Sequence, residues 1–289
     1  MNYRHAYHAG NFADVFKHVI LARIVEYLKR KDKAFRVYDT HAGLGVYDLA
    51  SVEAGKTNEW QEGVGRILST DVPEHIAPLL APWLDAVSAA GEGRYPGSPM
   101  VARHLLRKQD RLSLYEMHDE DYPHLAQQFS GDYQVRVNHL DGWLAPGAHI
   151  APKEARGMML IDPPFEDGND FDRMIDALEK ARKRWVGGTM ALWYPVKRRD
   201  HTDEWLGTLK GLKLNDLISA EIYIREPRSP SELNGCGMVI ANAPYTLRGE
   251  LGTLLPWLAQ TMQAPEVKAG TKPGDKGFFH RHRVMDLSG

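Results

Sequence analysis

The stretch that decides the fold is Met158-Met159-Leu160-Ile161-Asp162-Pro163-Pro164-Phe165. Its four apolar residues indicate a buried strand, and the prolines end that strand because proline cannot donate to a sheet ladder. Outward from this stretch, strands and helices alternate, which predicts a parallel, doubly wound α/β sheet. The other predicted strands cover 35–38, 111–117, 133–138, 189–194, 216–224 and 236–242, and the predicted helices cover 121–129, 169–186, 200–210 and 247–263. No helix separates the last two strands, so we expect them to form an antiparallel hairpin.

The remaining segments suggest the domain organisation. Asn11 is expected to cap an apolar helix that ends at the basic run from Lys29. Residues 46–97 are helical, with helices at 59–68 and 74–90, and we interpret them as an inserted subdomain after the first strand. Ser98 is expected to cap the next helix, with Pro99 at its first position. Residues 1–45 and 98–263 then form one domain with a seven-stranded, mostly parallel sheet, followed by a C-terminal tail, 264–289, that is expected to be irregular.

The segment Asp162-Pro163-Pro164-Phe165 is fairly specific for methylation of an exocyclic amine. The lone pair of such an amine is delocalised into the ring and must be localised before it attacks. Asp162 can accept one N–H and a carbonyl of the Pro-Pro turn can accept the other, while Phe165 offers a stacking face for an extruded adenine. A rigid turn keeps the amine in line with a methyl donor. These four residues are therefore the predicted catalytic segment for N6 methylation of adenine.

Three other strand ends predict a site for S-adenosylmethionine. Asp39-Thr40-His41-Ala42-Gly43 follows the first strand, and an acidic residue just before a glycine suits the amine of the cofactor. A dinucleotide fingerprint fails here, because Asp48 stands where its third glycine should be. Glu116 ends the second strand and can bind both ribose hydroxyls. Asp141-Gly142 follows the third strand, where the aspartate can bind the adenine amine of the cofactor.

Composition narrows the class of protein. The chain has 289 residues, 43% of them hydrophobic, and a single cysteine, which excludes an intramolecular disulfide framework and fits a reducing compartment. No apolar run approaches the ~18 residues of a membrane span, and the N-terminus lacks the pattern of a signal peptide. We therefore expect a cytoplasmic protein that binds no membrane. The early histidines His5, His8, His18 and His41 have no carboxylate or cysteine partners at ligand spacing, so no metal is expected.

The charge distribution points to a polyanionic partner more clearly than the net charge does. The formal net charge is −2, but basic residues gather in short runs. Lys197-Arg198-Arg199 directly follows an apolar strand, where the loops of a parallel sheet carry function. We expect this run and Arg4 to flank the mouth of the pocket and to contact RNA phosphates.

Taken together, these residues resemble the RlmJ family of 23S ribosomal RNA adenine-N6 methyltransferases over nearly the whole chain. The matching stretches are Tyr3-Arg4-His5, His8-Ala9-Gly10-Asn11, Asp14, Lys17-His18, Asp39-Thr40-His41-Ala42-Gly43, Tyr95-Pro96-Gly97-Ser98-Pro99, Glu116, Asp141-Gly142, Asp162-Pro163-Pro164, Ala191-Leu192-Trp193-Tyr194-Pro195-Val196 and Leu255-Pro256-Trp257-Leu258. The resemblance implies a Rossmann-like class I methyltransferase fold, S-adenosylmethionine as cofactor, and 23S ribosomal RNA as partner, either protein-free or early in assembly.

The same resemblance assigns roles to residues. It implies cofactor contacts from His18, His41, Ser98, Glu116, Asp141, Gly142 and Asp162. Lys17, Asp39 and Gly43, which stand in the same stretches, complete the predicted cofactor site. It places Tyr3 near the substrate adenine. The family often has tyrosine where this chain has Phe165, an exchange that keeps the stacking face and removes the hydroxyl.

Three other functions are compatible with parts of this pattern. A DNA adenine-N6 methyltransferase would use the same chemistry, but segment 46–97 is short for a target-recognition domain, which favours RNA. A non-catalytic RNA-binding protein on a methyltransferase fold is disfavoured by the intact Asp162-Pro163-Pro164. A small-molecule methyltransferase should have a lid and no basic rim. The target nucleotide and the oligomeric state are left open.

Overall fold

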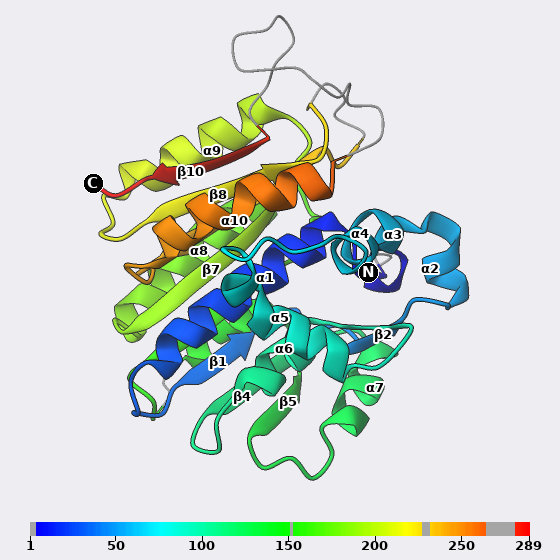
Figure 1. Cartoon of the computed structure of the whole chain (residues 1–289). Helices are drawn as coiled ribbons and strands as arrows, with labels where there is room; N and C mark the ends of the chain where they lie inside the picture. Colours follow the sequence, from blue (N-terminus) through cyan, green and yellow to red (C-terminus); the bar gives the residue numbers. More distant parts are fainter. Residues whose placement is uncertain (1–3, 151–152, 227–231, 264–280) are drawn as a thin grey trace, which may run out of the picture.

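An eight-stranded sheet forms the centre of the computed structural model, which describes residues 4–150, 153–226, 232–263 and 281–289 (Figure 1). The strand order is β10-β8-β9-β7-β6-β1-β4-β5. Strands β5, β4, β1, β6 and β7 pair in parallel, whereas β9 is antiparallel to β7 and β8, and β10 is antiparallel to β8. The strands are β1 Arg36–Asp39, β4 Arg111–Glu116, β5 Val135–His139, β6 Gly157–Ile161, β7 Gly188–Val196, β8 Ile218–Tyr223, β9 Gly235–Ala241 and β10 His282–Asp286.

This arrangement confirms the predicted Rossmann-like α/β sheet and the antiparallel pairing of its last two predicted strands. The predicted count of seven strands is wrong, because β10 comes from the stretch that was expected to be irregular. Val284 packs against the core on one face and Met285 against the core on the other. Arg283 donates to the buried carboxylate of Glu221 on β8. Two apolar residues among charged ones are too weak a signal to reveal this strand in the sequence.

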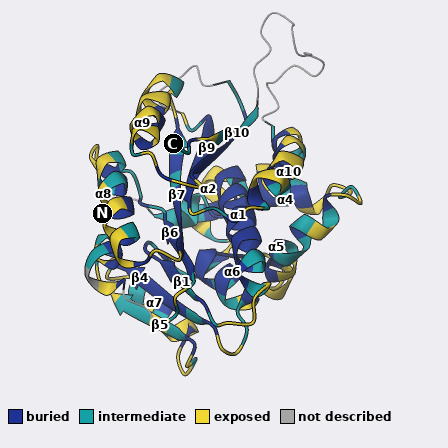
Figure 2. Ribbon diagram, turned by 90° about the vertical axis from the view of Figure 1, so that its left-hand side faces the viewer, coloured by how far each residue is buried: buried dark blue, intermediate teal, exposed yellow. Residues whose placement is uncertain are grey.

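Helices cover both faces of the sheet, and each face has its own apolar core (Figures 1 and 2). One core holds side chains of α1 Phe12–Lys29, α5 Ala77–Ala89, α6 Ser98–Leu105, α7 Asp121–Gln128 and α10 Leu247–Thr261. The other holds side chains of α8 Asp170–Arg184 and α9 Arg199–Gly211. Within the described ranges, none of the helices combines the length and apolar character that crossing a membrane requires.

Helix α1 carries polar side chains into the interior. Asn11 caps it as predicted, since its Oδ1 accepts hydrogen bonds from Ala13 N and Asp14 N, both at 3.0 Å. Apolar residues then bury the helix almost all round. Asp14, Lys17 and His18 are nevertheless buried in its first two turns. Because a buried charge is costly unless it is paired, these residues require partners, and they find them at the site described below.

Residues 46–97 are mainly helical, as predicted, but they differ in detail. The segment contains α2 Val52–Thr57, α3 Glu59–Glu62, α4 Val64–Leu68 and α5, and it adds a two-stranded sheet of β2 Val46–Asp48 and β3 Arg94–Pro96. The predicted helix 59–68 is broken at Gly63, where a Cβ would lie 2.2 Å from the carbonyl oxygen of Gly10. The predicted helix 74–90 begins only at Ala77. Leu80 and Trp83 share the core of α1, and the interpretation of the segment as an inserted subdomain stays a prediction.

Helix α6 begins differently from the prediction. Gly97 is its N-cap, and Ser98 is the first helical residue rather than the cap. The Ser98 side chain instead acts on the Asp39 carboxyl, whose pKa it lowers. Gly97 N donates to Gly45 O at 2.7 Å, and a Cβ on Gly97 would lie 3.0 Å from that oxygen. This close approach joins the start of α6 to the loop that follows β1.

Candidate active site

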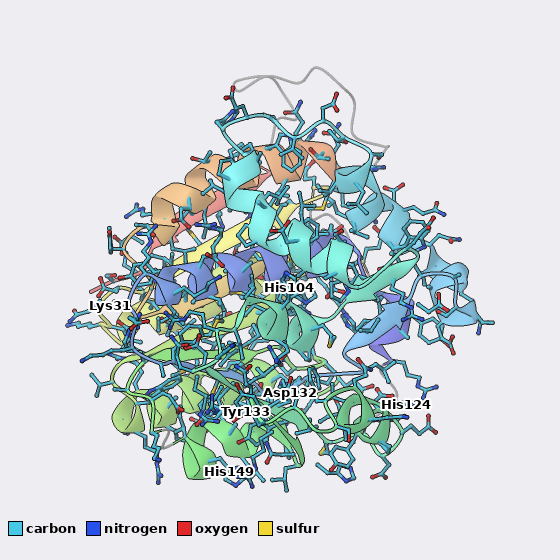
Figure 3. All side chains as sticks on the ribbon, turned by 60° about the horizontal axis from the view of Figure 1, so that its bottom comes forward. Lys31, His104, His124, Asp132, Tyr133 and His149 are labelled. Carbon is cyan, nitrogen blue, oxygen red and sulfur yellow. The ribbon has the colours of Figure 1, made fainter. Side chains whose placement is uncertain are left out.

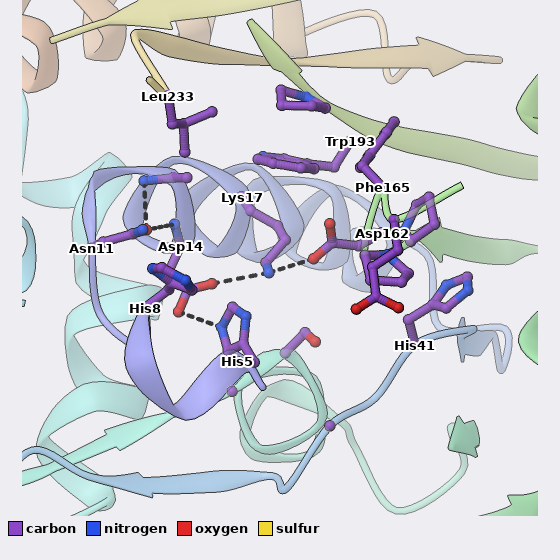
Figure 4. A pocket seen from close by; sticks show the side chains of 18 of the residues that line it. His5, His8, Asn11, Asp14, Lys17, His41, Asp162, Phe165, Trp193 and Leu233 are labelled. Carbon is purple, nitrogen blue, oxygen red and sulfur yellow. Dashed lines mark hydrogen bonds and ion pairs between the residues drawn. The ribbon is translucent and has the colours of Figure 1, made fainter. Parts of the chain in front are cut away.

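A cavity of about 990 Å³ lies at the carboxyl ends of β1, β4 and β6, where ligands bind in open α/β sheets (Figure 4). Thirteen of the predicted catalytic, cofactor and substrate residues line it: Lys17, His18, His41, Gly43, Ser98, Glu116, Asp141, Gly142, Asp162, Pro163, Pro164, Phe165 and Lys197. Asp39 is fully buried and lies next to Thr40, which does line the cavity. The described residues contain no group of three or more histidine, cysteine or acidic side chains arranged to hold a metal ion.

A chain of paired charges crosses one wall of this cavity. Lys17 Nζ lies 2.5 Å from Asp162 Oδ2 and 2.9 Å from Asp14 Oδ1. Asp14 Oδ2 in turn lies 2.9 Å from His5 Nε2 and accepts a hydrogen bond from Gly10 N at 2.9 Å. Figure 4 shows the three side chains of Asp14, Lys17 and Asp162 in a row from α1 to the end of β6. The lysine therefore fixes the Asp162 carboxylate at the cavity.

The charge state of this chain follows from its pairing. Burial alone would lower the pKa of Lys17, but the carboxylates of Asp14 and Asp162 raise it well above its usual range. Burial alone would raise the pKa of Asp14, but His5 and Lys17 hold it well below its usual range. Lys17 and Asp14 are thus both ionised across the ordinary pH range. Removing the lysine would leave the buried negative charge of Asp14 without one of its partners.

Glu116 ends β4 with both carboxylate oxygens held by backbone donors. Its Oε2 accepts from Gly43 N at 2.8 Å, and its Oε1 accepts from His118 N at 2.7 Å. Burial raises the pKa of Glu116, and these two hydrogen bonds partly offset that effect. Gly43 has a φ of 63° and lies so close to Tyr47 that a Cβ would be 2.3 Å from the tyrosine hydroxyl. The loop after β1 thus needs glycine here to place its backbone against Glu116.

Asp141 and Gly142 form the opposite wall. Asp141 Oδ1 accepts from Trp143 N at 2.9 Å, and Arg173 Nη2 of α8 lies 3.6 Å from Asp141 Oδ2. The Arg173 guanidinium also lies over the Trp143 ring, 4.5 Å from its centroid. A Cβ on Gly142 would lie 1.8 Å from the carbonyl oxygen of Thr40, so only glycine fits between the two loops. The chain therefore brings the ends of β1 and β5 into contact at the cavity.

Several buried polar atoms at this site have no hydrogen-bond partner among the described residues. They are Asp39 Oδ2 and His18 Nε2, and the cavity-lining side chains of Trp193 and Arg225 add Nε1 and Nε to this set. Burial raises the pKa of Asp39 to about 6, against the opposing effects of the Ser98 side chain and Lys17. Burial lowers the pKa of His18 to about 3, so its ring is neutral, and its Nδ1 lies 2.9 Å from the Tyr95 hydroxyl. An unpaired buried carboxylate oxygen and an unpaired ring nitrogen suit a ligand with an amine and other polar groups, as S-adenosylmethionine has.

Aromatic side chains form the far end of the cavity. Phe165 has a φ of 53°, an uncommon conformation that turns it out of the Pro-Pro segment. Its ring centroid lies 5.2 Å from that of Phe171 and 5.7 Å from that of Trp193 on β7. Phe165 and Trp193 both line the cavity, and Figure 4 shows them on the same side as Asp162.

The residues predicted to contact RNA are not all at the cavity. Lys197 lines the cavity, whereas Arg198 and Arg199 do not. Arg198 pairs with Asp200, and the Arg199 guanidinium lies 4.9 Å from the ring centroid of Tyr223. Arg4 pairs with Glu120 outside the cavity lining. Tyr3 lies outside the described residues.

Several site residues were missed in the sequence. Asp14 belongs to the stretches that carry the resemblance but has no predicted role, although the polar stripe of Asp14, Lys17 and His18 on a mostly apolar helix could have marked it. Trp193 lay in a matching stretch but received no role. Arg173 carries no local signal at all, since only the fold brings α8 to the loop after β5.

Comparisons with known proteins agree with this geometry. A family model described as "Ribosomal RNA large subunit methyltransferase D, RlmJ" matches residues 32–272. The chain belongs to the RlmJ family. It is 41% identical over 264 residues to ribosomal RNA large subunit methyltransferase J of Haemophilus influenzae, covering 91% of this chain and 94% of that protein. It is 38% identical over 275 residues to the protein of the same name of Escherichia coli, covering 94% and 96%.

A solved structure supports the same assignment. The crystal structure of protein LPL1258 from Legionella pneumophila matches with a TM-score of 0.81 and 31% identity, over 96% of this chain and 97% of that one. RlmJ membership confirms that the chain is a methyltransferase, and it confirms S-adenosylmethionine as the cofactor predicted from the sequence.

Proposed function

We propose that this RlmJ-family member transfers a methyl group from S-adenosylmethionine to the N6 amine of an adenine in 23S ribosomal RNA. The observation that carries the proposal is the convergence of Asp162-Pro163-Pro164-Phe165 with Glu116 and Gly142 on one cavity. The first set suits an aromatic amine and the second suits a nucleoside-containing cofactor. The names of the Haemophilus and Escherichia relatives support ribosomal RNA of the large subunit as the substrate.

The adenine would be bound at the aromatic end of the cavity. A base leaves its helix or loop to reach such a pocket, and stacking offsets part of the cost of extruding it. Phe165 and Trp193 both line the cavity, and their rings meet edge to face with centroids 5.7 Å apart. Asp162 would accept one N–H of the amine and a carbonyl of the Pro-Pro turn the other. The negative charge of Asp162 stabilises the positive charge that develops on the nitrogen.

Lys17 acts on this reaction through Asp162. Its side chain is only 6% exposed, and it bridges Asp14 and Asp162. The ammonium group holds the Asp162 carboxylate in one orientation, so one of its oxygens faces the lysine and the other remains for the amine. Lys17 is therefore a positioning residue for Asp162 in this proposal. This role takes the place of the cofactor contact predicted for Lys17 from the sequence.

The cofactor would lie between the ends of β1, β4 and β5. Glu116 would accept hydrogen bonds from the ribose, Asp141 would bind the adenine amine, and Asp39, with His18 and Ser98 beside it, would face the methionine portion. When bound, S-adenosylmethionine supplies an electrophilic methyl group. The residues of this chain hold the amine in line for one displacement, and the amine proton leaves to water afterwards.

The proposal is tested by product analysis. The purified chain is incubated with radiolabelled cofactor and a protein-free 23S ribosomal RNA transcript, and the RNA is digested to nucleosides. We expect label in N6-methyladenosine, and none when a DNA of the same sequence replaces the RNA. Label in another nucleoside would overturn the N6 assignment, and transfer to DNA alone would favour the DNA methyltransferase that the sequence left open.

A further inference from the structure

A second hollow lies on one face of the sheet, over β1, β4 and β5. Its volume is about 480 Å³, within the range of pockets that hold small ligands. It is separate from the cavity described above, apart from Tyr115, which lines both. The lining residues are Arg36, Tyr38, Ser113, Tyr115, Arg136, Asn138, Leu140, His149 and Lys153.

The hollow exists because the connection from β5 to β6 provides no long helix over this part of the sheet in its described residues. Parallel strands are usually covered by crossover helices on both faces. Here the connection forms only the short turns η2 Gly142–Leu144 and η3 Ala145–His149 within its described part. In Figure 2, β5 is coloured as partly exposed at the edge of the sheet, whereas β1, β6 and β7 are buried.

The side chains of the uncovered face are polar. On β5, Val135 and Val137 pack toward the core, whereas the alternate residues Arg136 and Asn138 face the hollow. On β4, Ser113 and Tyr115 take the equivalent positions, opposite Arg136 and Asn138 in the strand register. A face built to receive a helix would carry apolar residues at these positions. The sequence has instead placed hydrogen-bonding groups on adjacent strands.

The charge of the hollow is positive. Arg136 and Lys153 are exposed at its mouth, and Arg36 lies within it, paired with Glu154 at 2.9 Å and with the Ser113 hydroxyl at 3.0 Å. None of the described residues that line it is acidic, and Glu154, which pairs with Arg36, lies outside the lining. The ring of His149, labelled in Figure 3, stacks on that of Tyr115 with centroids 5.8 Å apart. Burial raises the pKa of Tyr38 to about 12, so its hydroxyl stays a neutral donor.

We propose that this hollow binds a phosphate-bearing nucleotide of the RNA substrate. This nucleotide would lie elsewhere on the RNA strand than the methylated adenine. The cations at the mouth, Arg136 and Lys153, would contact phosphate, and the deeper hydroxyl and amide groups would contact ribose or base edges. The inference rests on the proposed function, because RNA is the polyanion that the enzyme must hold. The position of the hollow beside an exposed edge strand lets a polymer enter and leave it.

The test compares two RNAs and three charge reversals. Arg136→Glu and Lys153→Glu alter the hollow, and Lys183→Glu, an exposed residue of α8, is the matched control. One RNA is a complete structural domain, and the other is the shortest hairpin that the wild-type enzyme methylates. KM for the domain should rise about tenfold in each hollow variant, the effect of losing one charge-assisted contact. KM for the hairpin and the affinity for S-adenosylmethionine should stay unchanged, and Lys183→Glu should change neither.

RNA binding measured against salt gives a second readout. The slope of log affinity against log salt should fall by about 0.7–0.9 in each hollow variant. Equal KM values and slopes for wild type and both hollow variants would overturn the inference, as would an equal loss on the hairpin. Binding of 5′-UMP that depends on Arg136, with domain RNA unaffected, would assign the hollow to a free nucleotide and also overturn it. If the wild type methylates no ribosomal RNA fragment, the proposed function fails, and the salt slopes measured on the domain RNA still decide whether the hollow binds RNA.

Discussion

Lys17 Nζ on helix α1 lies 2.5 Å from Asp162 Oδ2 at the end of strand β6, and this ion pair joins residues 145 positions apart in the chain. The lysine is buried and also binds Asp14, so it cannot turn away from the aspartate without stranding two charges. The geometry of Asp162 at the cavity is therefore set by a helix on one face of the sheet.

Replacing Lys17 should lower activity by more than the accompanying loss of stability explains. Lys17→Met keeps the length of the side chain but leaves Asp162 unoriented, so we expect turnover to fall by about 10²–10³. Arg23→Met is the matched control, because it breaks another buried ion pair of the same helix, Arg23 with Glu250 at 2.8 Å. Thermal unfolding and single-turnover methylation measured on both variants distinguish the two effects. Equal losses of activity in the two variants would mean that Lys17 acts only through stability.

Glu116 should control cofactor affinity without contributing to the chemistry. Glu116→Gln keeps the side-chain shape but replaces one acceptor with a donor that faces backbone N–H groups. We expect the affinity for S-adenosylmethionine to fall by about 1–3 kcal/mol, the cost of stranding buried hydrogen-bonding groups. Calorimetry of the folded variant is the measurement, and an unchanged dissociation constant would remove Glu116 from the cofactor site.

The buried carboxyl of Asp39 should make cofactor binding sensitive to pH. Burial raises its pKa to about 6, so it is ionised above that pH and becomes neutral below it. A cationic amine prefers the ionised form, so affinity should weaken as pH falls through 6, by up to tenfold per unit. His18 has a pKa of about 3 and does not titrate in this range. Calorimetry from pH 5 to 8 should show this slope in wild type and not in Asp39→Asn, whereas an identical slope in both would assign the titration to another group.

Lys197 and Arg198 offer a matched pair for the RNA rim. Lys197 lines the cavity, whereas Arg198 is paired with Asp200. Lys197→Ala should therefore weaken RNA binding and reduce its salt slope by about one phosphate contact, with cofactor affinity unchanged. Arg198→Ala should have the smaller effect. RNA affinity of both variants is measured by fluorescence anisotropy. Equal losses of affinity in Lys197→Ala and Arg198→Ala would contradict the prediction that position at the cavity decides which side chain contacts RNA.

The sequence predicted the strands and the strand-end residues because both depend on local pattern. Asp162-Pro163-Pro164, Glu116 and Asp141 each stand at or just after the end of a predicted strand, and parallel strands bring such ends to one edge. The same reasoning could not find the partners of these residues. Lys17 contacts Asp162, and links it to Asp14, only because α1 packs across the sheet. The polar stripe on the helix marks its own residues but does not identify this partner.

Other misses have equally specific causes. Strand β10 presents only Val284 and Met285 to the two cores, and the residues before it are rich in glycine, lysine and proline. Serine is a common helix cap, but Gly97 takes the cap position here, and the Ser98 side chain acts on the Asp39 carboxyl instead. Gly63 interrupts a helix because the backbone at Gly10 lies against it, a contact that is invisible in the sequence.

The most direct test of the account is single-turnover methylation of a protein-free 23S ribosomal RNA transcript by Asp162→Asn. The amide keeps the shape of the side chain but loses the negative charge that stabilises the developing positive charge on the amine nitrogen and pairs with Lys17. Asp167→Asn, an exposed residue that also lines the cavity, is the control. We predict that the rate falls by about 10²–10³ in Asp162→Asn, with a smaller loss of cofactor affinity, and is unchanged in the control. A wild-type rate in Asp162→Asn would mean that the Asp-Pro-Pro turn is structural and would contradict the N6-adenine mechanism.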